Sequence, residues 1–457
     1  MGKRGGRGKI ATHIRLQESM EGAVAQAQKA PTATTDPNEA AALNDVFAKL
    51  GQKAAASWNT TGDPCSGTAT DGTDINDSSI NPAIKCDCSD QNNTVCHITR
   101  LSFDINTLSG PVPKELGNLT NLISLGFGSN NFNGSLPSEL GSLFNLEQLY
   151  IDSAGLSGAL PSSFSKLTRM KILWASDNNF TGQIPDYIGG WNLTDLDFSY
   201  NQLSGNFPSW ASDKKLQLYL VANNFVIDRS NSVLPLELEC LQRNTTFSLA
   251  SPFAVKCGSS RSMTDSNNNF YQTDDATLGP ASYNVRKTSS PIWAVSNVGK
   301  FMDTLASDGN YMIFYSSQSQ NTLASELFQS ARMSPSSLRY YGIGLENGNY
   351  NVTLQFAELG FTESQSWRGT GRRVFDIYVQ GERKEQNFDI RKAVGGKSNT
   401  AIKKDYTIHV TKNIVEIHLF WAGKGTCCIP SQGYYGPSIS ALSVTPSTLL
   451  NYYVFFV

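Results

Sequence analysis

The chain of 457 residues has few charged side chains, no excess of either charge and no long apolar run. Charged residues make up 17% of it, and 37 Lys and Arg stand against 39 Asp and Glu, for a net charge of −2. Without a basic excess, the sequence gives no electrostatic reason to expect nucleic-acid binding. The longest apolar stretches fall short of the ~18 residues that a membrane span needs. Residues 1–30 start basic but lack the apolar segment of a signal peptide.

The eight cysteines are unevenly distributed, and four of them lie close together in an Asn-rich, polar region. This clustering favours disulfides and an oxidising compartment over a zinc site, because Cys86-x-Cys88 lacks the two-residue gap of a zinc knuckle. Spacing does not decide the pairing. The disulfide candidates are Cys65, Cys86, Cys88, Cys96, Cys257, Cys427 and Cys428. No metal site and no cofactor is expected.

A repeat of 24 residues dominates the first half of the chain. Apolar, Asn, Gly and Pro positions recur on one grid, with Ala154 in place of one Asn; the Asn positions are Asn106, Asn130, Asn178, Asn201 and Asn223. A fixed period of this length predicts a solenoid. Each Leu-x-Leu segment is expected to form a short parallel strand that needs neighbouring units to satisfy its backbone. The Asn amides are expected to bond the loop backbone of adjacent units as a ladder.

The repeat unit resembles the plant-type leucine-rich repeat. The segment Trp58…Gly62-Asp63-Pro64-Cys65 with the following cysteines resembles the disulfide-stapled cap that precedes such repeats in plant receptor ectodomains. Such a cap covers the otherwise exposed core of the first unit.

One column of residues is predicted to face the concave side of the solenoid. Strands about 4.8 Å apart bring these side chains into a row of rings and carboxylates. Rings that cover apolar faces, next to acids that accept hydrogen bonds, suit a sugar or an extended peptide; the alternative is that they only cover the sheet or contact the second domain. The ligand-binding candidates here are Tyr150, Asp152, Trp174, Asp197 and Tyr219.

Residues 253–446 show the period-two alternation of half-buried antiparallel strands, for example around Tyr350–Phe356 and Val415–Leu419. Short strands joined by Gly-, Asn- and Ser-rich turns predict a β-sandwich. The motifs Phe253-Ala254-Val255-x-Cys257-Gly258, Tyr340-Tyr341-Gly342 and Tyr434-Tyr435-Gly436-Pro437 resemble malectin and plant malectin-like domains. Animal malectin binds sugars with ring aromatics, and the resemblance makes Tyr340 and Tyr341 further ligand-binding candidates.

The order of solenoid and sandwich resembles the extracellular part of plant leucine-rich-repeat receptor-like serine/threonine kinases with a malectin-like domain. The predicted fold is an α/β-solenoid leucine-rich repeat, mostly parallel β, followed by an all-β malectin-like sandwich. Expected segments are an unstructured N-terminus (1–35), the cap (36–97), the solenoid (98–240), the sandwich (251–446) and a tail (447–457). No kinase motif such as His-Arg-Asp or Asp-Phe-Gly is present in this sequence.

Function is predicted to be recognition without catalysis. Glu358 and Asp376 are the pair to test for glycoside hydrolysis, but neither has a companion nucleophile, base or metal motif. The resemblance implies a carbohydrate or peptide ligand, a membrane co-receptor as a possible partner, and an extracellular or plasma-membrane-associated location. The alternative is a soluble repeat-type inhibitor or decoy of a wall-degrading enzyme.

Asn-x-Ser/Thr sequons provide candidate glycosylation sites, although their number is close to the chance expectation for this composition. The candidates are Asn59, Asn92, Asn118, Asn133, Asn179, Asn192 and Asn351.

Overall fold

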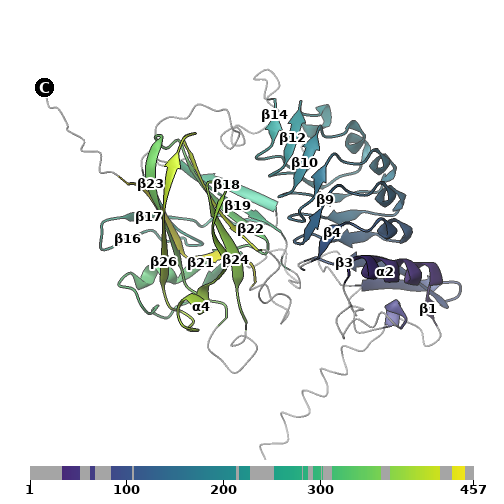
Figure 1. Ribbon diagram of the computed structural model, residues 1–457, viewed down its shortest axis with the longest axis horizontal. Coiled ribbons are helices and arrows are strands. Elements are labelled where there is room, and N and C mark those ends of the chain that lie inside the picture. The colour runs from purple at the N-terminus through teal and green to yellow at the C-terminus, as the bar shows by residue number, and fades with distance from the viewer. Residues whose placement is uncertain are drawn as a thin grey trace, which may run out of the picture.

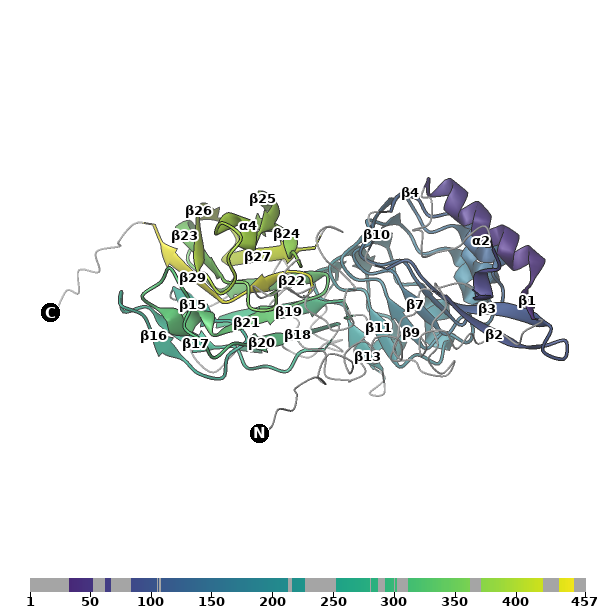
Figure 2. The same ribbon diagram turned by 90° about the horizontal axis from the view of Figure 1, so that it is seen from below.

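The computed structural model describes residues 33–51, 62–66, 84–104, 106, 108–212, 216–226, 252–279, 281–286, 292–299, 301, 311–361, 371–421 and 435–447. A capped solenoid of parallel strands and an antiparallel sandwich lie side by side (Figures 1 and 2). This arrangement confirms the predicted fold class. Within the described ranges, no helix has the length and apolar character needed to cross a membrane.

The cap is built on helix α2 (Pro37–Lys49) and the short 3-10 turn η1 (Pro64–Ser66). The Asp36 carboxylate caps α2 by accepting hydrogen bonds from the backbone N–H of Asn38 and Glu39, and Pro37 occupies the first turn, where its missing N–H is harmless. The buried face of the helix carries Ala42, Leu43 and Val46, and it covers the apolar end of the solenoid.

Two disulfides hold the cap together, Cys65–Cys86 and Cys88–Cys96. Spacing alone had left this pairing open. One expectation for the N-terminus was wrong: Thr34 and Thr35, assigned to an unstructured segment, form strand β1 (Thr34–Thr35) and pair in parallel with β3. The strand persists because Thr35 also contacts Asp63, and its hydroxyl accepts a hydrogen bond from the Cys65 N–H at 3.0 Å.

The main sheet of the solenoid follows the repeat in chain order, β1-β3-β5-β7-β9-β11-β13, with β2 paired to β3. The grid leucines from Leu101 to Leu196 point inward and are at most 1% exposed. The strands are β2 (Ile84–Asp90), β3 (Val95–Ser102), β5 (Ser124–Gly126), β7 (Gln148–Tyr150), β9 (Ile172–Trp174), β11 (Asp195–Asp197) and β13 (Gln217–Tyr219).

Turns and 3-10 helices return the chain to the next unit. The grid glycines have positive φ, for example 88° at Gly110 and 76° at Gly134, which L side chains rarely adopt. The connecting elements are β4 (Ser109–Pro111), β6 (Asn131–Asn133), β8 (Ser157–Gly158), β10 (Asn179–Gly182), β12 (Gln202–Gly205), β14 (Asn224–Phe225), η2 (Lys114–Asn118), η3 (Ser138–Ser142), η4 (Ser162–Lys166), η5 (Asp186–Gly190) and η6 (Ser209–Ser212).

The asparagine ladder is present as predicted. Asn130 donates from Nδ2 to the carbonyl oxygens of Phe127 and Gly128 in its own unit, and to that of Phe103 in the preceding unit at 2.9 Å. Its Oδ1 accepts from the Leu108 N–H. Asn178, Asn201 and Asn223 repeat this pattern. Each amide therefore satisfies backbone groups of two units and fixes their spacing.

The sandwich consists of two six-stranded sheets, in the orders β16-β17-β15-β29-β23-β26 and β18-β19-β22-β27-β24-β25, with a small third sheet β20-β21-β28. Their inner faces enclose one apolar core. The predicted strands around Tyr350–Phe356 and Val415–Leu419 are confirmed by alternating burial.

The bounds of the sandwich elements are β15 (Phe253–Lys256), β16 (Met263–Thr264), β17 (Phe270–Thr273), β18 (Ala281–Arg286), β19 (Ile292–Val298), β20 (Met312–Phe314), η9 (Ser325–Phe328), β21 (Ser330–Met333), β22 (Ser337–Ile343), β23 (Gly348–Phe356), β24 (Val374–Val379), β25 (Glu382–Asp389), α4 (Ile390–Ala393), β26 (Ile402–Val410), β27 (Ile414–Phe420), β28 (Ser438–Ile439) and β29 (Ala441–Pro446).

Cys257 corrects one disulfide expectation, because it is a free thiol buried in the sandwich core. Burial, followed by the nearby Asp274 carboxylate, raises the pKa of the thiol well above its ordinary value, so it behaves as a small apolar side chain. Cys427 and Cys428 lie outside the described residues, as does the sequon at Asn59.

Candidate functional site

The predicted concave column is assembled by the parallel register of the main sheet. Tyr150 lies opposite Trp174, Trp174 opposite Asp197, and Asp197 opposite Tyr219. The rings of Tyr150 and Trp174 contact edge to face, with centroids 5.0 Å apart. Tyr150 is largely buried, whereas Trp174 and Tyr219 keep part of their surface accessible. The accessible part of this row, at Trp174 and Tyr219, is where a ligand contact is predicted.

Asp197 of this row and Asp152 beside it are both buried, although both were predicted to face a ligand. Asp197 is 1% exposed and accepts hydrogen bonds from Ser199, both from the backbone N–H at 2.9 Å and from the hydroxyl. Burial raises the pKa of Asp197 to about 6. Burial, then the charges of Asp104 and Asp197, raises the pKa of Asp152 well above its ordinary value.

The two adjacent tyrosines of β22 point in opposite directions, as neighbours in a strand must. The Tyr340 ring lies in the sandwich core, is 0% exposed, and donates its hydroxyl to Asp274 at 2.6 Å. Its role in this structure is to pair a buried carboxylate. Tyr341 faces outward, toward the solenoid. The two candidates therefore serve different surfaces.

A second column of the solenoid, absent from the sequence prediction, makes the contact with the sandwich. The residue before each ladder position has a left-handed backbone, with φ between 50° and 57° at Ser129, Ser153, Asp177, Tyr200 and Ala222. A non-glycine residue costs about 1–2 kcal/mol in this conformation. The sandwich contacts Ser153, Asp177 and Tyr200 of this column, and these contacts offset the cost of the left-handed backbone.

The contacts at this junction are specific. Arg339 of β22 donates to the Asp177 carboxylate at 2.5 Å, and its guanidinium lies 4.0 Å from the centroid of the Tyr200 ring. The Tyr200 and Tyr341 rings are parallel, with centroids 6.5 Å apart. One unit earlier, the Ser336 hydroxyl contacts the Ser153 hydroxyl at 2.7 Å. Three units of the solenoid therefore contact the segment from Ser336 to Tyr341, which consists of β22 and the residue before it.

Arg339 is the centre of the ion pairs at the junction. Burial opposes ionisation of Asp177, but the Arg339 cation outweighs it and lowers the pKa of this carboxyl. Glu416 lies 3.2 Å from the other side of Arg339. Burial, reinforced by Arg339, lowers the pKa of nearby His418 to about 3, so the imidazole is neutral at ordinary pH. Its Nε2 lies 2.8 Å from the Ser337 hydroxyl.

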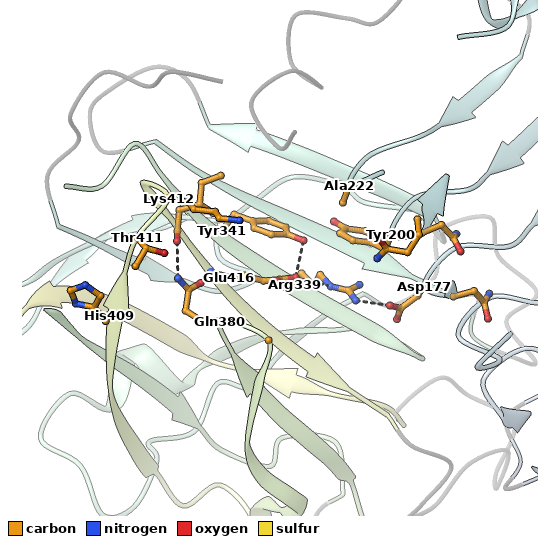
Figure 3. Close-up of a pocket in the computed structure, with 15 residues that line it drawn as sticks. Asp177, Tyr200, Ala222, Arg339, Tyr341, Gln380, His409, Thr411, Lys412 and Glu416 are labelled. Carbon is orange, nitrogen blue, oxygen red and sulfur yellow. Dashed lines mark hydrogen bonds and ion pairs between the residues drawn. The ribbon is translucent and has the colours of Figure 1, made fainter. Parts of the chain in front are cut away.

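An open pocket of about 720 Å³ lies at the rim of the junction, with walls from both the solenoid and the sandwich (Figure 3). Tyr200 and Tyr341 face each other across it, while His409, Thr411 and Lys412 line its far side. The Gln380 side chain is held in place by two hydrogen bonds. Its Nε2 donates to the Ile414 carbonyl, and its Oε1 accepts from the Glu416 N–H. The pocket combines ring faces, amides and the exposed cation of Lys412.

Glu358 and Asp376, the candidate pair for glycoside hydrolysis, both have partners within the sandwich. Glu358 accepts from Arg373 at 2.9 Å and from the N–H groups of Gly360 and Phe361, and both charged side chains are 1% exposed. Asp376 accepts from the Asn387 N–H at 2.7 Å. In the described part of the chain, no group of three or more His, Cys, Asp or Glu side chains is placed to hold a metal ion.

One sequence signal pointed to the junction column. Its position precedes the ladder asparagine and has a left-handed backbone, for which Gly or Asn is the usual residue. Asp177, Tyr200 and Ala222 stand there instead. A bulky Tyr at such a position is unusual and marks a site with a contact to make. The identity of the partner, β22, is not encoded in the repeat.

The family comparisons agree with this architecture. Residues 251–442 match the malectin domain family model, and residues 169–191 and 192–213 match the leucine rich repeat model. The second half of the chain therefore resembles malectin domains, and the segment before it resembles leucine rich repeats.

The relatives share this combination. One probable LRR receptor-like serine/threonine-protein kinase of Arabidopsis thaliana is 50% identical over 268 residues, which cover 56% of this chain and 25% of the relative. Another from the same plant is 50% identical over 242 residues, covering 50% and 22%. The chain thus spans about a quarter of the length of these relatives. These matches confirm the resemblance to plant leucine-rich-repeat receptor-like kinases.

Among solved structures, the LRR ectodomain of the receptor kinase SOBIR1 from Arabidopsis thaliana is 23% identical, with a TM-score of 0.34. The alignment covers 42% of this chain and 97% of that one.

Proposed function

We propose that this chain is a non-catalytic recognition module that binds a cell-wall carbohydrate or a peptide outside the cell, as the ectodomain of a receptor-like kinase would. The observation that carries the proposal is the presence of partly accessible aromatic rings on the concave face and of an open pocket at the junction. Trp174 and Tyr219 keep part of their rings accessible on the concave sheet, and Tyr200 lines the pocket at the junction.

The chemistry of this surface suits capture better than turnover. Half-buried rings cover the apolar faces of sugars or peptide side chains, and amides and carboxylates accept and donate hydrogen bonds at their edges. Glu358 and Asp376 are occupied by Arg373 and by a backbone N–H respectively. Two carboxylates committed to structural partners supply neither the acid nor the nucleophile of a glycosidase.

The rigid junction supports recognition that involves both domains. Because Arg339 ties Asp177, Tyr200 and Glu416 together, the pocket walls are held in place before a ligand arrives. Preorganisation of this kind improves affinity by reducing the ordering that binding requires.

The test is direct binding of the full chain to cell-wall oligosaccharides and to peptides, by array and then calorimetry. For the bound ligand, Trp174→Ala is expected to weaken affinity by roughly 1–3 kcal/mol if the ring is an anchor. Lys412→Ala reports on the pocket, because this exposed lysine lines it. Phe144→Ala is the matched control, since Phe144 is 52% exposed and lies outside the concave sheet.

The outcomes separate the two parts of the surface. A loss with Trp174→Ala alone assigns the ligand to the concave column, and a loss with Lys412→Ala alone assigns it to the pocket. Equal behaviour of both variants, Phe144→Ala and the unchanged chain would overturn the proposed surface. Turnover of an oligosaccharide that is abolished by Glu358→Gln would overturn the non-catalytic assignment.

A further inference from the structure

A second hollow lies on the side of the sandwich that faces away from the solenoid. The solenoid packs against β22, in one sheet, whereas this hollow lies on the outer face of the other sheet, over β23, β26 and β29 (Figure 1). We call it the outer groove. Its volume is about 610 Å³. The floor residues project from strand positions two apart, which share one face.

The floor is a platform of hydroxyls and amides. Thr353 lies between Asp405 of β26 and Ser443 of β29, and Asn351 lies between Thr407 and Thr445. The Thr353 hydroxyl donates to Asp405 at 2.6 Å, which fixes the centre of the platform. Neighbouring strands are about 4.8 Å apart, so donors and acceptors recur at a spacing that hydroxyl groups of a saccharide can follow.

Each of the three charged residues that line the groove has a partner, either an opposite charge or hydrogen-bond donors. Lys403 lies 3.2 Å from the Asp405 carboxylate. Asp265, on one wall, accepts from the N–H groups of Asn267 and Asn269 at 2.9 Å and from the Asn269 side chain. Charged groups that already have partners, beside many hydroxyls and amides, favour a neutral hydroxylated ligand over an ionic one. Leu323, 99% exposed on the opposite wall, offers an apolar face for the C–H side of a sugar ring.

A glycosylation sequon lies on the floor of this groove. Asn351-Val352-Thr353 lies within β23, and Asn351 is exposed. Its Oδ1 accepts from the Thr407 hydroxyl at 3.1 Å and from the Ser447 hydroxyl at 3.0 Å. Neither bond uses Nδ2, the atom to which a glycan is attached. A glycan on Asn351 would therefore keep both hydrogen bonds and begin directly on the platform.

We propose that the outer groove holds the N-linked glycan of Asn351 itself, whose first sugars lie on the hydroxyl and amide platform. None of the other described candidate sequons, at Asn92, Asn118, Asn133, Asn179 and Asn192, lines the groove, and two of them serve as references. Asn92 lies in a turn, and Asn179 lies on β10 of the solenoid, both exposed and outside the groove lining. The proposal concerns a different face from the ligand surface above, so either can fail without the other.

The experiment uses the full chain, directed into the secretory pathway of plant cells by an added signal sequence. Glycopeptide mass spectrometry first measures occupancy at Asn351, Asn92 and Asn179. Endoglycosidase treatment of the folded protein then measures how fast each glycan is removed. The Asn351 glycan is expected to be released about tenfold more slowly than the other two, the protection that roughly one net hydrogen bond confers.

Groove variants separate binding from simple crowding. Leu323→Ala is expected to speed release at Asn351, and its matched control is Phe314→Ala, a 63% exposed sandwich residue outside the groove lining. Both side chains are exposed, so neither change should disturb folding. An Asn351 without sugar, release at the rate of the other two sites, or equal effects of the two variants would each overturn the proposal.

Discussion

The solenoid buries a small polar amide at the same place in most of its units, whereas the sandwich buries large charged pairs at single places. In the solenoid, one asparagine amide serves two units, as Asn130 does for its own and the preceding one. In the sandwich, Arg332 and Asp274 are both 0% exposed and form a bidentate pair at 2.6 and 2.7 Å. Loss of one solenoid asparagine leaves polar groups unsatisfied in two units only. Loss of one side chain from the sandwich network leaves a buried charge without its partner.

The largest expected effect comes from breaking the sandwich network. Arg332→Met is expected to lower the free energy of unfolding by about 3–5 kcal/mol, because Asp274 is then buried without its cation. Urea titration of the full chain, followed by tryptophan fluorescence, measures the change; Trp293 and Trp421 report from the sandwich.

The double variant Arg332→Met/Asp274→Asn is the control for this prediction. Asn removes the orphan charge but still accepts from the Tyr340 hydroxyl, which now bonds Asp274. It should recover most of the lost stability. A single variant as stable as the original chain would contradict the idea that the sandwich depends on one network.

A smaller effect is expected from removing one rung of the ladder. Asn130→Ala removes the partner of the Leu108 N–H in one unit and a donor to the Phe127 and Gly128 carbonyls in the next, and should cost about 2 kcal/mol in the unfolding of the solenoid. Asn106→Ala is the matched control, because the Asn106 side chain donates only to Phe103 and Asp104 of its own unit. Equal losses in the same urea titration would show that bridging between units contributes nothing.

The smallest expected effect is a gain, at the concave carboxylate. The pKa of Asp197 rises to about 6 on folding, from an ordinary 3.8. Its destabilising effect is thus absent below about pH 4, grows as pH rises to 6 and is constant above. Asp197→Asn should therefore stabilise the solenoid by about 1–2 kcal/mol at pH 8, and not at pH 4.

Urea midpoints at the two pH values measure this difference. Asp186→Asn, at an exposed position, is the control and should change neither midpoint. A gain that is equal at both pH values would separate the effect from ionisation of Asp197. Weaker ligand binding in the stabilised variant would show that the concave face keeps this acid for function.

The sequence predicted the solenoid well because its structure is local and periodic. The leucine, asparagine and glycine positions each do one job per unit, so spacing alone assigns them. It could not choose between Tyr340 and Tyr341 as ligand contacts. Strand periodicity places adjacent residues on opposite faces, but which face meets the solenoid depends on how the two domains pack.

Pairing of distant groups was the other failure. Cys257 was grouped with the disulfide cysteines, yet it lies in an apolar core beside Asp274 and remains a thiol. The junction column was missed for a related reason. Period reveals which positions are equivalent, but Asp177 and Tyr200 acquire their role only from Arg339, more than 100 residues away in the chain.

The left-handed column determines which units of the solenoid contact the sandwich. Each described unit presents one such residue, and Ser153 and Asp177 contact Ser336 and Arg339 in the same order along the chain. These contacts fix the position of the sandwich along the solenoid to within one strand spacing, about 4.8 Å. Removing one complete unit before the junction would leave this register untouched. Removing the unit that carries Asp177 would shift these contacts by one strand. Arg339 would then lie opposite Tyr200, which has no carboxylate to pair with it. The number of units before the junction is therefore free to vary, whereas the residues of the units that form the junction are not.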